Sequence, residues 1–146
     1  MFALNFSKRH KHAGSAIPAL AATRGCIINM ASVAGMGAIP LGSAYCSSKA
    51  GVILLTQTAA LELRSAGIRL NAICPGFIQT EMVERLIPEF EAGAGVNFDE
   101  FGSRLQGRIG MPQEVAQVAV FLASDNASFV SGAAYTVDNG LTASVV

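Results

Sequence analysis

GCIINMA, at residues 25–31, is a short apolar run with two adjacent β-branched isoleucines. A run of this length without alternating polar residues is typical of a strand that is buried on both faces of a parallel sheet. IRLNAIC, at residues 68–74, has the same character and is stopped by the Pro-Gly pair at residues 75–76. AAYTV, at residues 133–137, is the third expected strand. Together the three runs predict a parallel sheet.

Helices are expected between these strands. The longest spans residues 44–64, where apolar side chains recur at helical spacing. Residues 3–20 are expected to form a helix before the first strand, and Pro112 opens another at an early helical position. Residues 80–107 are expected to hold two short helices around a Gly-Ala-Gly hinge at residues 93–95. Strands that alternate with helices in this way predict an α/β fold with right-handed crossovers.

Length and composition favour one domain over residues 1–146, and 51% hydrophobic residues indicate extensive burial or an association partner. Ten basic and ten acidic residues give zero net charge, so we expect neither nucleic acid nor an anionic membrane surface as a partner. The sequence contains no stretch of 18 apolar residues, so we expect no membrane span. Residues 1–6 are too short and too soon followed by charge for a secretory signal, so we expect a cytoplasmic protein.

The cysteines and histidines follow no metal-binding pattern. Cys26, Cys46 and Cys74 are widely spaced and form no CxxC pair. We therefore interpret them as small buried side chains in a reducing compartment. His10 and His12 are two residues apart and would point to different faces of a helix. We expect no metal site.

The pattern that carries chemistry consists of Ser32, Tyr45 and Lys49. Tyr45 and Lys49 are four residues apart at the start of an expected helix, which puts both side chains on one face. A nearby ammonium and the positive end of a helix both favour a phenolate, so that a tyrosine can exchange a proton with an alcohol or a carbonyl. Ser32 follows the first strand, at the edge where α/β sheets bind their ligands. Proton transfer at oxygen and hydride transfer at carbon interconvert an alcohol and a ketone, and the hydride requires a cofactor.

Five motifs in a fixed order strengthen this interpretation. They are IINMASVAG around Ser32, AYCSSKAG around Tyr45 and Lys49, IRLNAICPGFIQT at residues 68–80, RIGMPQEVA at residues 108–116 and ASFVSG at residues 127–132. In this order they closely resemble the C-terminal half of the short-chain dehydrogenase/reductase family, over roughly residues 17–142. The resemblance implies a partial Rossmann-like fold, a doubly wound parallel sheet with about three strands and flanking helices.

The resemblance also implies roles for individual residues. Ser32 would orient the substrate oxygen, Tyr45 would act as the acid/base, and Lys49 would bind the nicotinamide ribose of a cofactor that is NAD or NADP. Besides Tyr45 and Lys49, the cofactor-binding residues would be those of the Pro-Gly turn and the segment after it, Pro75, Gly76, Ile78 and Thr80. Asn5 lies thirteen residues before Pro18, as a family asparagine does before a proline, and is a further catalytic candidate.

Other elements of the family are not found in this sequence. They are the Gly-x-x-x-Gly-x-Gly turn that cradles the pyrophosphate, the residue that selects NAD or NADP, and an Asn-Asn-Ala-Gly element. Neither of the glycine pairs within residues 35–37 and 93–95 lies between the end of a strand and the start of a helix. We therefore interpret both pairs as residues that make a loop flexible. Asn139 stands where the family more often has glycine, which we interpret as a minor change. We expect a truncated chain that is impaired as an oxidoreductase when it is alone.

Two alternatives stay open beside an oxidoreductase that takes a small-molecule alcohol or ketone. One is a non-catalytic interaction module, which pairs with a full-length relative through residues 3–20 and 44–64, the surface by which the family typically dimerises. The other is a gene fragment without a folded product, which the poor family match of residues 1–16 favours. For the enzyme we expect a homo-oligomer. The segment 81–107 would line its pocket, and its apolar residues indicate an apolar substrate or a contribution to the core.

Overall fold

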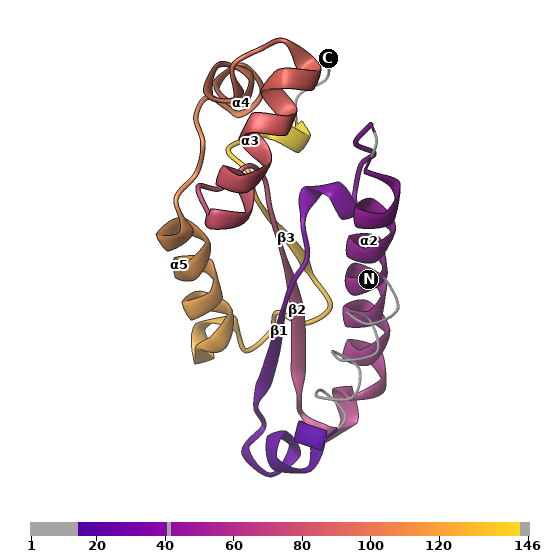
Figure 1. The fold of residues 1–146 in the computed structure, drawn as a ribbon. Coiled ribbons are helices and arrows are strands. Elements are labelled where there is room, and N and C mark those ends of the chain that lie inside the picture. The colour runs from indigo at the N-terminus through magenta and orange to yellow at the C-terminus, as the bar shows by residue number, and fades with distance from the viewer. Residues whose placement is uncertain (1–14, 41, 144–146) are drawn as a thin grey trace.

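The chain forms an open parallel sheet with helices on both faces (Figure 1). The computed structural model describes residues 15–40 and 42–143. Strands β1 (Cys26–Met30), β2 (Arg69–Pro75) and β3 (Ala134–Val137) lie in the order β1-β2-β3, and both neighbouring pairs are parallel. The three strands expected from the sequence are therefore confirmed, with boundaries that shift by one residue.

Strand β2 is the centre of the core because its side chains alternate between the two faces of the sheet. Cys74 packs on the face that is covered by α2 (Ser43–Glu62). Ile73 packs on the opposite face with Leu122 of α5 (Pro112–Ala123). The two helices lie on opposite sides of the sheet in Figure 1. This double burial explains why the sequence of β2 is apolar without alternation.

The helices begin and end within a few residues of the expected boundaries. Residues 15–23 are helical, so this helix continues three residues beyond its expected end, and residues 3–14 of the expected helix lie outside the described residues. Helix α2 ends two residues early because a 3-10 turn, η2 (Arg64–Ala66), follows it. Helix α5 begins at Pro112 as expected.

Two helices, α3 (Glu81–Ala94) and α4 (Phe98–Gln106), fill the segment between β2 and α5, as expected. The Thr80 hydroxyl caps α3 by accepting a hydrogen bond from the Val83 N–H at 3.4 Å. Gly95 ends α3 in the left-handed conformation with φ +68. The prediction of a hinge over residues 93–95 is wrong at Gly93, because Gly93 lies inside α3. The helix ends at Gly95.

Alanine at these two glycines is expected to change stability in opposite directions. An added Cβ meets no atom within 4 Å at either position, so only the backbone conformation differs. We expect Gly95→Ala to lower the free energy of unfolding by about 1–2 kcal/mol because its φ is positive. We expect Gly93→Ala to raise it by about 0.5–1 kcal/mol because alanine favours a helix over glycine. Urea unfolding measures both values, and shifts of the same sign would contradict the two conformations.

Short 3-10 turns follow β1, α5 and β3. They are η1 (Val33–Gly35), η3 (Asp125–Ala127) and η4 (Leu141–Ala143). Within residues 15–40 and 42–143, no helix combines the length and the apolar character that a membrane crossing requires.

Candidate active site

The carboxyl ends of the parallel strands meet at one edge of the sheet, on the side where α3 and α4 lie (Figure 1). Ser32 follows β1 at this edge and is only 8% exposed. It is the N-cap of η1, and its Oγ accepts a hydrogen bond from the Ala34 N–H at 3.1 Å. This bond fixes the position of the Ser32 hydroxyl.

Tyr45 and Lys49 lie one turn apart near the start of α2, as their spacing predicts. The Lys49 Nζ atom is 5.6 Å from the centre of the Tyr45 ring, a distance at which a cation is attracted to an aromatic face. The same Nζ donates a hydrogen bond to the Met30 carbonyl at 3.2 Å. The last residue of β1 therefore holds the ammonium beside Tyr45.

A close main-chain contact sets the spacing between η1 and α2. A Cβ at Gly35 would lie 2.6 Å from the Lys49 carbonyl carbon and 2.8 Å from the Ala50 nitrogen. Any side chain at this position would push η1 away from α2. Gly35 therefore serves close packing and not, as expected, loop flexibility.

A cavity of about 380 Å³ opens between these residues, the turn after β2, and helices α3 and α5. Apolar side chains form most of its wall, as in many small-molecule sites, with Met82 and Val115 among them. Seven of the eight predicted site residues line this cavity: Ser32, Tyr45, Lys49, Pro75, Gly76, Ile78 and Thr80. The eighth, Asn5, lies outside the described residues. The geometry thus brings seven of them together, and their individual roles stay predictions.

The three cysteines differ in burial. Cys74 is fully buried, and this burial raises the pKa of its thiol, against smaller opposing effects of a Ser32 backbone hydrogen bond and the Lys49 charge. The thiol is therefore neutral and inert at neutral pH. The expected burial is confirmed for Cys74 and wrong for Cys26 and Cys46, which are partly exposed. The described residues contain no cluster of three histidine, cysteine or acidic side chains that could hold a metal ion.

Asp138, the residue after β3, forms a buried hydrogen-bond cluster with the turn that follows it. Its carboxylate accepts hydrogen bonds from the Thr142 hydroxyl at 2.6 Å, the Thr142 N–H at 2.9 Å and the Gly140 N–H at 3.2 Å. Desolvation raises the pKa of this carboxyl, but the hydrogen bonds outweigh it and hold the pKa below its ordinary value. The charged form of Asp138 therefore orders this turn at neutral pH.

Two residues beside the cavity were not identified from the sequence. Gln106, the last residue of α4, is 3% exposed and binds the turn after β2, yet no motif singles it out. Asn139 has φ +47, and its Nδ2 donates a hydrogen bond to the Gln106 carbonyl at 2.7 Å. Asparagine tolerates this left-handed backbone, which agrees with the interpretation of the change from glycine as minor, and the side-chain hydrogen bond is an additional contact.

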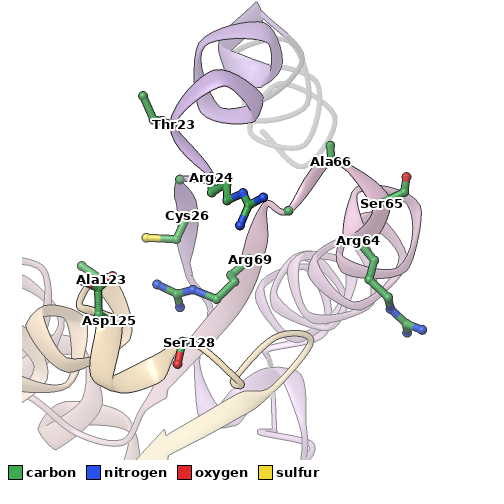
Figure 2. A pocket seen from close by; sticks show the side chains of 12 residues that line it. Thr23, Arg24, Cys26, Arg64, Ser65, Ala66, Arg69, Ala123, Asp125 and Ser128 are labelled. Atoms are coloured by element: carbon green, nitrogen blue, oxygen red, sulfur yellow. The ribbon is translucent and has the colours of Figure 1, made fainter.

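A larger cavity, of about 760 Å³, opens at the opposite edge, where β1 and β2 begin (Figure 2). Arg24, Arg64 and Arg69 are among its lining residues. The Arg69 guanidinium donates hydrogen bonds to the carbonyls of Leu122 at 2.8 Å and Ser124 at 3.2 Å, and so caps the end of α5. The Arg64 side chain points away from the cavity (Figure 2). Arg69 thus stabilises the fold, and the seven predicted site residues that the structure describes line the other cavity.

Comparisons with known proteins cover nearly the whole chain. A protein-family model described as enoyl-(acyl carrier protein) reductase matches residues 1–142. Meso-2,3-butanediol dehydrogenase from Serratia marcescens is 42% identical over 130 residues, which are 88% of this chain and 49% of that protein. Cyclohexanol dehydrogenase from Acinetobacter sp. (strain SE19) is 47% identical over 127 residues, which are 86% of this chain and 47% of that protein. The chain therefore spans about half the length of these relatives.

Solved structures agree with this fold. Levodione reductase is 40% identical with a TM-score of 0.72, over 81% of this chain and 46% of that one. A structure described as ElxO with NADP bound has a TM-score of 0.75 at 29% identity, over 88% of this chain and 51% of that one. Both likenesses place the three strands and flanking helices in a Rossmann-like sheet.

Proposed function

The chain belongs to the short-chain dehydrogenase/reductase family, and from this premise we propose that it carries the catalytic site of an enzyme that interconverts a secondary alcohol and a ketone. The observation that supports this proposal best is the one cavity shared by Ser32, Tyr45 and Lys49. These side chains come from two different elements, so their meeting is a property of the fold and not of their spacing alone.

In this proposal Tyr45 and Ser32 act on the substrate oxygen. The Tyr45 hydroxyl exchanges a proton with that oxygen, as a positioned general acid or base does. The Ser32 Oγ already accepts the Ala34 N–H, which leaves its own O–H to be donated to the substrate oxygen. The Lys49 ammonium, 5.6 Å from the centre of the Tyr45 ring, binds the nicotinamide ribose in this proposal.

The residues of the cavity fit the nicotinamide end of NAD or NADP. When it is bound, such a cofactor supplies or accepts the hydride. Apolar side chains such as Ile78 and Val115 suit the flat face of a nicotinamide ring, and the Lys49 ammonium suits ribose hydroxyls. The relative that was solved with NADP supports this cofactor class. The proposed contacts from this chain are Tyr45, Lys49, Pro75, Gly76, Ile78 and Thr80.

The wall of the cavity favours an uncharged, apolar substrate. Met30, Met82 and Val83 line it, and Lys49 is the one charged side chain among the described lining residues. A substrate that carries a carboxylate or phosphate far from the reacting carbon would find no second cation there. The names of the relatives, a butanediol and a cyclohexanol dehydrogenase, agree with small neutral alcohols.

Thermal unfolding with dinucleotides tests the proposed function. We expect the melting midpoint of the 146-residue chain to rise with NAD(H) or NADP(H), since a ligand at a hundredfold excess over its Kd adds about 2.7 kcal/mol of stability. ADP-ribose, which lacks the nicotinamide ring, is the matched control and should raise the midpoint less. An unchanged midpoint with all four dinucleotides would contradict a nicotinamide site in this chain.

A second candidate function, association through the outer face of α2, is supported by two exposed leucines. Leu54 and Leu61 are seven residues apart, so they lie on one side of this helix, and both are about two-thirds exposed. Pairing with another copy or with a longer relative would bury them. Analytical ultracentrifugation measures the size of the oligomer. An oligomer of defined size would favour association as the main function if its melting midpoint also stays unchanged when dinucleotides are added.

A further inference from the structure

The turn after β2 forms one wall of the cavity and is held by main-chain bonds at both of its ends. The Gly76 N–H donates to the Val137 carbonyl at 3.1 Å, and the Gln79 N–H donates to the Gly110 carbonyl at 2.8 Å. Between them, the Phe77 carbonyl accepts a hydrogen bond from the Gly110 N–H at 2.9 Å, but no main-chain group of the described residues accepts the Phe77 N–H. This N–H therefore needs another partner.

The side chain of Gln106 supplies that partner. The Phe77 N–H donates to Gln106 Oε1 at 2.9 Å, and Gln106 Nε2 donates to the Phe77 carbonyl at 2.7 Å. One side-chain amide thus binds both polar groups of one residue, as a neighbouring strand would. Its second Nε2 hydrogen goes to the Arg108 carbonyl at 2.8 Å, so both amide hydrogens are used.

Packing around this amide is close. A Cβ at Gly76 would lie 2.5 Å from Gln106 Oε1, so the turn can approach the amide only because residue 76 is glycine. The Phe77 ring makes edge contacts with Phe98 at 5.6 Å and Phe101 at 5.9 Å between ring centres. Helix α4 therefore anchors Phe77 by its backbone and by its side chain.

Asn139 connects Gln106, at the end of α4, to the turn after β3. Its Nδ2 donates to the Gln106 carbonyl oxygen at 2.7 Å, and its backbone has φ +47, which asparagine tolerates better than most residues. The turns after β2 and β3 and the end of α4 thus meet at Gln106.

We propose that Gln106 is a positioning residue, which holds the turn of residues 75–78 in the shape that receives the nicotinamide end of the cofactor, with Asn139 holding Gln106. The part of this inference that concerns the cofactor rests on the proposed function. Gln106 does not line the cavity and acts only through the turn. No other side chain among the described residues binds the backbone of this turn.

The test compares Gln106→Met with the wild-type chain in two measurements. Methionine has a similar length and no amide, so we expect the amides of Gly76, Phe77 and Gln79 to exchange with solvent about tenfold faster in native-state hydrogen exchange. We expect the Kd for whichever of NADH or NADPH binds the wild type to rise by about tenfold as well. Asn139→Gly keeps the left-handed backbone and removes one bond, so it should change both values in the same direction by about threefold.

The matched control is Asn71→Leu, because Asn71 is another fully buried amide that binds two backbone groups, the Val130 carbonyl and the Ala133 N–H. It lies near the other end of β2 and is expected to lower global stability without faster exchange at residues 76–79 beyond the global change. Equal effects of Asn71→Leu and Gln106→Met on the turn would overturn the inference, as would unchanged exchange in Gln106→Met. If the wild type binds neither dinucleotide, the proposed function fails, and the exchange rates alone decide the role of Gln106.

Discussion

Replacement of Tyr45 by phenylalanine is expected to lower kcat/KM for the oxidation of a secondary alcohol by about 10²–10⁴-fold. The change removes only the phenolic oxygen, which we propose exchanges the proton. The ring itself stays, so its contact with the Lys49 ammonium and its packing at the start of α2 are kept. Steady-state rates with cyclohexanol and each oxidised dinucleotide measure the effect, and thermal unfolding checks that the fold is unchanged.

The second tyrosine of the chain provides the control for this experiment. Tyr135 lies in β3, where its ring packs against Phe121 at 6.5 Å between ring centres. It does not line the cavity. Tyr135→Phe should therefore keep the wild-type rate. A Tyr45→Phe chain that is as active as Tyr135→Phe would show that another group accepts the proton of the alcohol.

Replacement of Leu122 by alanine is expected to lower the free energy of unfolding by about 2–5 kcal/mol. Leu122 is 0% exposed and packs with Ile73 of β2 on the face of the sheet that α5 covers. Its removal leaves a cavity in the centre of that layer. For a chain of this size, each kcal/mol should lower the melting temperature by about 2–4 °C, which calorimetry measures directly.

Val120 lies on the same helix and serves as the control for Leu122. It is 71% exposed, so Val120→Ala should change stability by no more than about 0.5 kcal/mol. If both variants lose the same stability, helix α5 does not cover the sheet through Leu122. If neither loses stability, the chain has no cooperative core on this face.

The fold was predictable where hydrophobic pattern and turn residues agree. The strands that contain Ile28 and Ile73 were expected from apolar runs, and the sharp end at Pro75 from its Pro-Gly pair. Helix boundaries were less predictable, because a 3-10 turn after α2 has the same composition as another helical turn. The hinge was misplaced at Gly93 because a glycine inside a helix looks the same in sequence as a glycine that ends one.

The residues of the candidate site that belong to sequence motifs were predictable. Ser32, Tyr45 and Lys49 belong to runs with a characteristic order, and the structure gathers them at one cavity. Gln106 was not predictable, because its function depends on three hydrogen bonds to backbone atoms that carry no sequence signature. Asn139 differed from the family pattern, but its partner is a main-chain carbonyl, which no residue type reveals.

The contact between Gly35 and the main chain at Lys49 bears on redesign of this site. The distance between η1 and α2 is set by backbone atoms of Gly35 on one side and of Lys49 and Ala50 on the other. A library of variants that changes only the apolar side chains of the cavity wall therefore leaves the relative placement of Ser32 and Lys49 intact. Variants at Met82 or Val83 would then test the proposed substrate preference while the proposed proton-transfer groups keep their positions. Position 35 should be excluded from such a library, since even alanine there would force the two halves of the site apart.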